Sequence, residues 1–182
     1  TKGTLQRASA EIGLPGVDLE YYKFNYQHQL FHPLSNTFTL MLNGELGIAG
    51  GYGGKPLPFF KNYYAGGNSS VRGFDSGSLG PRDINGESLG GTSRIVGNAE
   101  VLFPFPGLKN EKSVRLSVFL DGGTVYGSDG VIPGAEGVRF ATGLGLSWVS
   151  PVGPLKFNFA FPLNAKADDK KQRFQFQLGQ TF

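Results

Sequence analysis

Residues 37–49 read TFTLMLNGELGIA and alternate apolar and polar side chains almost without interruption. Successive side chains of an extended chain point to opposite faces, so one face of this segment is apolar. The apolar face carries Phe38, Leu40, Leu42, Leu46 and Ile48. The other face carries polar side chains such as Asn43 and Glu45. This pattern predicts a β-strand that lies between apolar surroundings and water.

Seven other segments show the same alternation. They are residues 3–13, 20–32, 92–104, 112–126, 138–149, 154–163 and 172–182. Each is at least about as long as the 9 to 11 residues that a tilted strand needs to cross a membrane. Aromatic residues recur near strand ends, as in the girdles of membrane barrels. We therefore predict an all-β, antiparallel transmembrane barrel, with a soluble β-sandwich as the alternative because each segment alone is a weak signal.

The composition argues against several classes of function. The 182 residues include 29 glycines and 11 prolines, which disfavours a helical bundle. The absence of cysteine excludes disulfides and thiol nucleophiles, and His28 and His32 would lie about 13 Å apart on one strand, too far to share a zinc ion. A formal net charge of +3 predicts no nucleic-acid partner. We expect no metal and no cofactor.

No arrangement of nucleophile, base and acid suggests a hydrolase, so we expect a protein that is not an enzyme. The alternative from a different class is a small outer-membrane barrel enzyme. No run of about 18 apolar residues predicts a transmembrane helix.

The connections between segments differ in length. Residues 33–36 and 150–153 form tight turns, whereas 50–91 and 127–137 are longer and fall on the opposite side. Outer-membrane barrels place their short turns in the periplasm and their long loops outside the cell. The C-terminus is therefore expected on the periplasmic side.

Residues 50–91 form a connection of about forty residues, and its aromatic, proline and glycine content predicts order. At its centre lies Arg72. Glu100 and Asp121 are predicted on the inner faces of adjacent strands, where two carboxylates repel each other unless a cation lies between them. An arginine can bridge both, because its planar fork carries five donors.

Two further expectations concern the neighbours of these residues. Gly73 would allow a tight turn beside the wall, and Phe74 would pack against inner aromatic residues such as Phe119. Residues 168–171, Asp-Asp-Lys-Lys, are expected to form a solvated hairpin turn.

Four motifs together resemble one family. The loop contains FFKNYYAGG at 59–67, followed by Val71-Arg72-Gly73-Phe74. FLDGGTVY at 119–126, WVSPVGPL at 148–155 and FQFQLGQTF at 174–182 follow in the same order as in the family. The chain thus resembles the BamA family, the central subunit of the outer-membrane β-barrel assembly machinery, over essentially its whole length.

The resemblance implies a sixteen-stranded barrel, of which this chain would supply strands nine to sixteen as one C-terminal region, 1–182. The POTRA domains and the first half of the barrel would be absent. The first and last strands would then be unpaired edges, unless the chain closes on itself, pairs with another copy or meets its missing half elsewhere. The long loop would fold into the lumen, with Val71, Arg72, Gly73 and Phe74 at its tip and Glu100 and Asp121 as partners of Arg72.

For the last strand the resemblance implies both an assembly signal and one side of a weak seam. The residues concerned are Phe174, Phe176, Leu178, Gly179 and Phe182. The implied function is insertion of β-barrel proteins into the bacterial outer membrane. The implied partners are outer-membrane lipid, nascent barrel proteins, the lipoproteins of the machinery and POTRA domains of the same protein. A two-partner secretion or translocation-assembly pore of the same superfamily is the alternative.

Overall fold

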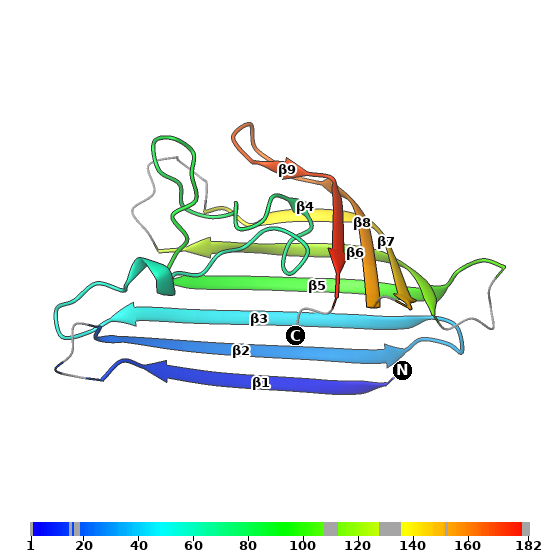
Figure 1. Ribbon diagram of the computed structural model, residues 1–182, viewed down its shortest axis with the longest axis horizontal. Helices are drawn as coiled ribbons and strands as arrows, with labels where there is room; N and C mark the ends of the chain where they lie inside the picture. Colours follow the sequence, from blue (N-terminus) through cyan, green and yellow to red (C-terminus); the bar gives the residue numbers. More distant parts are fainter. Residues whose placement is uncertain are drawn as a thin grey trace.

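The computed structural model describes residues 2–14, 16, 19–107, 113–127, 136–151 and 153–179. Its main element is one antiparallel sheet of eight strands in the order β1-β2-β3-β5-β6-β7-β8-β10 (Figure 1). These strands are β1 (Gly3–Ile12), β2 (Tyr21–Pro33), β3 (Thr39–Gly51), β5 (Ser93–Pro104), β6 (Val114–Tyr126), β7 (Arg139–Ser150), β8 (Gly153–Pro162) and β10 (Phe174–Leu178). A separate two-stranded sheet pairs β4 (Gly73–Phe74) with β9 (Lys171–Gln172).

The predicted all-β, antiparallel fold is confirmed, with eight strands in one sheet. Seven of the segments begin and end within two residues of their predicted bounds. The last prediction, 172–182, is partly wrong, because β10 begins only at Phe174 and the residues before it pair with the long loop instead of continuing the large sheet. Local alternation could not reveal this change of partner. Phe182 lies outside the described residues.

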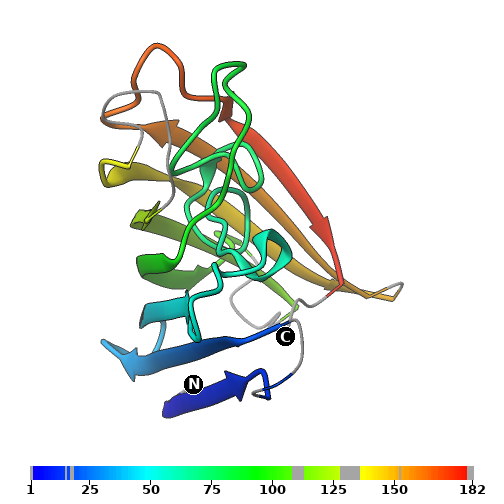
Figure 2. The ribbon, with the colours of Figure 1, turned by 90° about the vertical axis from the view of Figure 1, so that its left-hand side faces the viewer.

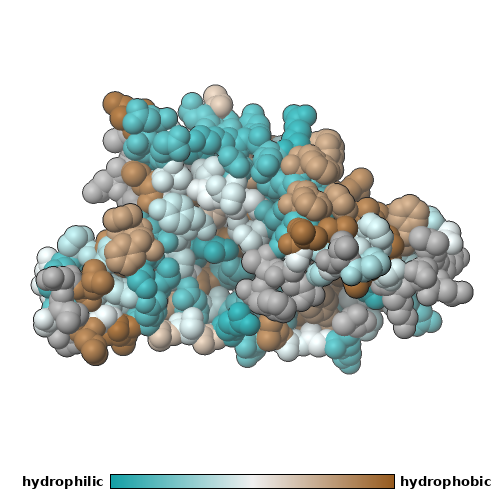
Figure 3. Space-filling model, viewed as in Figure 1, coloured by the Kyte–Doolittle hydropathy of each residue, from teal (hydrophilic) through white to brown (hydrophobic). Residues whose placement is uncertain are grey.

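The sheet curves into an open trough whose two ends are β1 and β10 (Figure 2). Its outer face is apolar, and large side chains on it are about half exposed. They include Leu46, Ile48, Val118, Leu120, Leu144 and Phe159. Polar side chains such as Asn25, Asn43 and Asn98 line the inside of the trough. Figure 3 shows hydrophilic residues over much of the middle of the side on which the long loop lies. The sheet therefore separates apolar surroundings outside from a polar interior.

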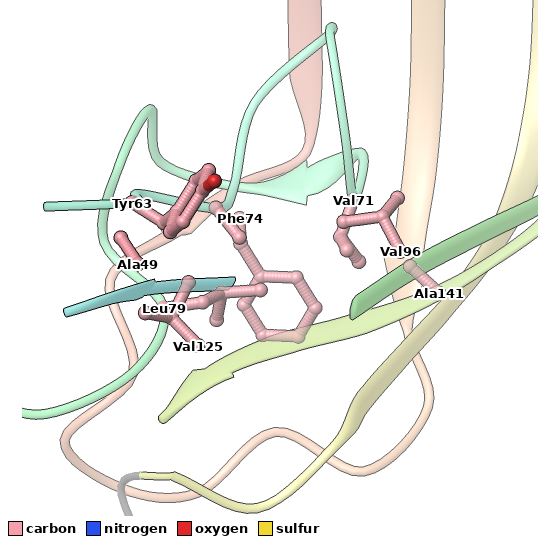
Figure 4. Close-up of a cluster of buried hydrophobic side chains, with 9 residues drawn as sticks. Ala49, Tyr63, Val71, Phe74, Leu79, Val96, Val125 and Ala141 are labelled. Atoms are coloured by element: carbon pink, nitrogen blue, oxygen red, sulfur yellow. The ribbon is translucent and has the colours of Figure 1, made fainter. Parts of the chain in front are cut away.

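Residues 52–92, which join β3 to β5 and which we call the long loop, lie inside the trough (Figures 1 and 2). They include one turn of 3-10 helix, η1 (Phe59–Lys61). Side chains of the loop and the inner sheet face form a buried apolar cluster (Figure 4). The cluster contains Ala49, Tyr63, Ala65, Val71, Phe74, Leu79, Val96, Val125 and Ala141. The hydrophobic core thus lies between the loop and the wall.

The long loop leaves the sheet at one end, and the two tight turns lie at the other, together with the connection of residues 105–113 (Figure 1). The β1–β2, β3–β5 and β8–β9 connections lie at the first end, and the β2–β3 and β7–β8 turns lie at the second. Within the described ranges, no helix is long and apolar enough to cross a membrane.

Candidate functional site

Arg72 extends from the tip of the long loop to the inner wall, where it meets two carboxylates. Its Nε and Nη2 donate to Asp121 Oδ2 and Oδ1 at 2.7 and 2.8 Å, and its Nη1 donates to Glu100 Oε2 at 2.9 Å. The backbone N–H of Arg72 also donates to Asp121 Oδ2, at 3.1 Å. All three side chains are at most 4% exposed. We call this group the arginine clamp.

The clamp buries three charged side chains, so its stability depends on the geometry of the hydrogen bonds between them. Desolvating three charges costs several kcal/mol per ion, and this cost is offset only where hydrogen bonds are well formed. The two-pronged bond to Asp121 satisfies that condition, because a planar guanidinium matches a carboxylate. In the described part of the chain, Glu100 Oε1 is buried without a hydrogen-bond partner. Glu100 is therefore the less completely satisfied of the two acids.

Phe119 supports the arginine from below. The guanidinium carbon of Arg72 lies 3.5 Å from the centre of the Phe119 ring, a cation–π contact. The ring has room because residue 143, on the neighbouring strand β7, is glycine. A Cβ atom at Gly143 would lie 2.7 Å from Phe119 Cζ and 2.2 Å from the carbonyl oxygen of Phe159. Phe119, which was predicted as an example of the aromatic residues that Phe74 would contact, thus lies under Arg72. Phe74 itself belongs to the apolar cluster between the loop and the wall.

Gly73 turns the loop directly beside the wall. Its φ of +88° lies in the region that favours glycine, and a Cβ atom there would approach the Ala160 side chain to 3.1 Å. The turn lets Gly73 and Phe74 form β4 against β9. On either side of Gly73, Val71 and Phe74 are fully buried. The four residues of the loop motif therefore serve as one ion-pairing residue, one turn and two apolar anchors.

A second ion cluster was not predicted from the sequence. Asp169 accepts from Arg82 Nη2 at 2.8 Å and from Arg139 Nε at 2.6 Å, and its side chain is 1% exposed. Arg82 belongs to the long loop, and Arg139 is the first residue of β7. The expectation of a solvated turn at 168–171 is therefore wrong for Asp169, although Asp168 is exposed. We call this group the outer clamp.

The outer clamp shifts the titration of its acid. Burial alone would raise the pKa of Asp169, but hydrogen bonds from Arg139, from the Lys166 backbone and from Arg82 outweigh burial and hold that pKa below its ordinary value. Sequence alternation did place Arg139 on the inner face, where an arginine needs an acidic partner. Nothing in the sequence identified which acid that would be.

Tyr63 anchors the first part of the long loop to the opposite side of the trough. Its hydroxyl donates to the Phe24 carbonyl or to Asn25 Oδ1, at 3.0 and 2.7 Å. Its ring lies on Gly47, where a Cβ atom would come within 2.6 Å of it. Two residues earlier, Lys61 pairs with Glu11 on β1. The loop is thus held at both walls and at its tip.

The residues predicted for the terminal strand lie on β10 or just beyond it. Phe174, Phe176 and Leu178 point outward and are at least half exposed. The Phe176 ring lies 5.1 Å from that of Phe157 on β8. Gly179 has a φ of +86°, and its N–H donates to the Pro154 carbonyl at 2.8 Å. The outward side chains of these residues take no part in the ion pairs of either clamp.

The described residues contain no group of three or more His, Cys, Asp or Glu side chains that could hold a metal ion. A polar hollow of about 680 Å³ remains between the loop and the inner wall. Asn25, Gln27, Asn43, Asn98 and Lys156 are among the residues that line it.

Comparisons with known proteins agree on one family. The family model described as "Omp85 superfamily domain" matches residues 1–182. The outer membrane protein assembly factor BamA of Neisseria meningitidis serogroup B is 46% identical to this chain, and the match covers the whole of this chain. The sorting assembly machinery 50 kDa subunit of Saccharomyces cerevisiae is 30% identical, again over the whole chain, which covers 39% of that protein.

A solved structure gives the same result for the fold. The crystal structure of BamA from Haemophilus ducreyi lacking POTRA domains 1-3 matches with a TM-score of 0.88 and 31% identity, over 96% of this chain and 38% of that one. The chain spans 26% of the Neisseria protein. The predicted resemblance to the BamA family is thereby confirmed. The chain belongs to the Omp85 superfamily, and its eight-stranded sheet corresponds to the C-terminal part of a BamA barrel.

Proposed function

We propose that the protein to which this chain belongs folds and inserts β-barrel proteins into the bacterial outer membrane. The observation that carries the proposal is the arginine clamp, which holds the tip of the long loop against the inner wall of a barrel similar to that of BamA. The names of the relatives, an assembly factor and a subunit of a sorting assembly machinery, support it. The chain would act without a catalytic group, as a scaffold that lowers the barrier to insertion.

The partners and the location follow from the same proposal. The outer apolar face would contact outer-membrane lipid, and nascent barrel proteins would be the substrates. POTRA domains, the first eight strands and lipoproteins of the machinery would complete the assembly. The end of the sheet that carries the long loop would face the cell exterior and the end with the two tight turns the periplasm, which puts the end of β10 on the periplasmic side. In this arrangement, residues 1–182 are one C-terminal barrel region that contains the long loop.

A functional role for the clamp is tested by reconstitution. The full-length protein and its Arg72→Ala variant would be placed in lipid vesicles and supplied with an unfolded outer-membrane barrel protein. Folding of the substrate is read as the heat-modifiable shift of its gel mobility. We expect Arg72→Ala to slow folding at least tenfold. Arg7→Ala, which removes an exposed arginine from β1, is the matched control and should fold substrate at the normal rate.

Two results would count against the proposal. If the unaltered protein accelerated no barrel folding but exported one soluble partner, the secretion-pore alternative would replace it. If substrate folded equally fast with Arg72→Ala, the clamp would have no part in the activity.

A further inference from the structure

The arginine clamp contains more negative than positive charge. Its one cation is Arg72, and its two carboxylates are those of Glu100 and Asp121. Arg72 donates to both oxygens of Asp121 but to only one oxygen of Glu100. Within the described residues, the other oxygen, Glu100 Oε1, is buried without a hydrogen-bond partner. Arg72 therefore leaves one negative charge in the clamp that a further cation could offset.

Lys156, on β8, is a cation that lines the same polar hollow as Arg72 and Glu100. Its side chain shares the inner face with that of Asn158, two residues later, whose Oδ1 lies 3.5 Å from Nη1 of Arg72. Lys156 and Arg72 both lie close enough to Glu100 to interact with its charge. Yet the Lys156 ammonium forms no hydrogen bond or ion pair with any residue that the structure describes. It is therefore available to Glu100.

Small residues lie on the two strands that separate Lys156 from Glu100. The strands β6 and β7 lie between β8 and β5 in the sheet. Lys156 pairs with Ser147 on β7, and Gly145 on the same strand pairs with Ser117 on β6. A Cβ atom at Gly145 would lie only 2.4 Å from Ser117 Oγ. The wall between the two charges is thus low, and a lysine side chain can extend over it.

We propose that Lys156 is a second counter-ion of the arginine clamp and competes with Arg72 for Glu100. Because Lys156 belongs to the wall, it stabilises this buried acid whether or not the long loop is in place. Arg72 then neutralises less charge when it binds, so the loop is held less firmly than it would be by the two acids alone. Lys156 thus makes the clamp easier to open. This inference concerns how the loop is held and does not depend on what the barrel inserts.

The first test removes the charge of Lys156 in the full-length protein. Lys156→Met keeps an unbranched side chain of similar length. We expect protease cleavage within residues 52–92 to become about two- to fivefold slower, the range of ion pairs that solvent reaches. Lys156→Arg keeps the charge and should be cleaved at the original rate. Arg7→Met, which removes another cation of the same hollow, is the control and should also change nothing. Unchanged or faster cleavage in Lys156→Met would overturn the proposal, because lost packing could only loosen the loop.

The second test asks whether the effect requires both competitors. In an Arg72→Ala background the loop brings no cation to the wall, so Lys156→Met should no longer slow cleavage. In a Glu100→Gln background there is no charge to compete for, and the effect should again disappear. Slowing that persisted in either background would show that Lys156 acts on the loop by another route.

The third test measures the wall instead of the loop. The midpoint of unfolding in denaturant should fall in Lys156→Met, and it should fall further when the same substitution is made in Arg72→Ala, because Glu100 then has no cation left. The loop and the wall would thus respond in opposite directions, which a purely structural role of Lys156 does not predict. An Arg72→Ala protein whose midpoint is indifferent to Lys156→Met would refute the second counter-ion.

Discussion

The ring of Phe119 lies 3.5 Å beneath the guanidinium carbon of Arg72, in space that Gly143 leaves open on the neighbouring strand. The clamp therefore depends on Phe119, which carries no charge and lies opposite Glu100 in the pairing of β5 with β6. Its geometry is determined by three layers: a glycine in the wall, an aromatic ring above it and the arginine on top.

Gly143→Ala should disrupt this stack. The new Cβ atom would lie 2.7 Å from Phe119 Cζ and 2.2 Å from a backbone oxygen, which cannot move away easily. Overpacking of this kind costs about 1–3 kcal/mol. The loss would be measured as a lower midpoint of unfolding in denaturant. Gly97→Ala is the control, because a Cβ atom there meets nothing within 4 Å, and it should leave the midpoint unchanged.

Arg72 variants should loosen the long loop in a graded way. Arg72→Ala leaves two acids without their cation, and loss of one partner of a well-buried pair costs about 3–5 kcal/mol. Arg72→Lys keeps the charge but loses the fork, so its effect should be smaller. Protease cleavage within residues 52–92 measures the change. Cleavage that stays at the original rate in Arg72→Ala would show that the loop is held without the clamp.

The two acids of the clamp should differ in importance. Asp121 accepts three hydrogen bonds from Arg72, whereas Glu100 accepts one. Asp121→Asn should therefore expose the loop to protease more than Glu100→Gln does. The reverse order would mean that the charge of Glu100 matters more than the geometry at Asp121.

The outer clamp should be sensitive to acid. Because the pKa of Asp169 is lowered in the folded protein, its contribution to stability is fully present above the ordinary aspartate pKa of about 3.9. That contribution is lost as the pH falls through the lower, folded pKa. Hydrogen exchange of residues 163–173, corrected for its intrinsic pH dependence, should stay slow from pH 7 to 5 and accelerate in strong acid.

Substitutions of Asp169 and of its neighbour Asp168 distinguish the effects of the two acids. Asp169→Asn should give fast exchange in 163–173 at neutral pH already. Asp168→Asn is the matched control, because Asp168 is exposed and contributes its backbone carbonyl to Arg82. If Asp168→Asn and Asp169→Asn behaved alike, burial of Asp169 between two arginines would not be the cause.

Tyr63→Phe should loosen only the first part of the loop. The variant keeps the ring on Gly47 and loses the hydroxyl contacts with the Phe24 carbonyl and Asn25. One such hydrogen bond contributes about 0.5–1.5 kcal/mol. Cleavage near η1 should rise several-fold while cleavage near Arg82 stays constant. Tyr64→Phe, at a neighbouring residue that is 42% exposed, should have no effect.

The sequence was most informative where one rule governs many residues. Alternation along β3 located the strand and its outward residues, because a one-residue error would turn Leu46 and Ile48 into the polar interior. The acids Glu100 and Asp121 could be placed on the inner face by the same rule. To predict that these acids contact Arg72, the path of the long loop must also be known, and alternation does not give that path. The contact was predicted from the repulsion between the two acids and from the family resemblance.

The outer clamp and the end of the sheet could not be predicted in this way. Asp169 lies in a polar hairpin that is chemically ordinary, and its burial depends on Arg82, 87 residues earlier. The pairing of β4 with β9 joins two-residue segments, too short for any periodic signal. Both features arise from the way the long loop folds back over the wall.

The wall and the long loop match each other at single residues. Tyr63 lies over Gly47, and Val71 lies over Gly123. Phe119, which carries Arg72 on its ring, lies over Gly143. These glycines lie on three different strands, and Gly123 and Gly143 are far in the sequence from the loop. A loop exchanged alone with a distant relative would therefore meet a wall shaped for another loop. Functional chimaeras in this superfamily should require the loop and its facing glycines to be transferred as one unit.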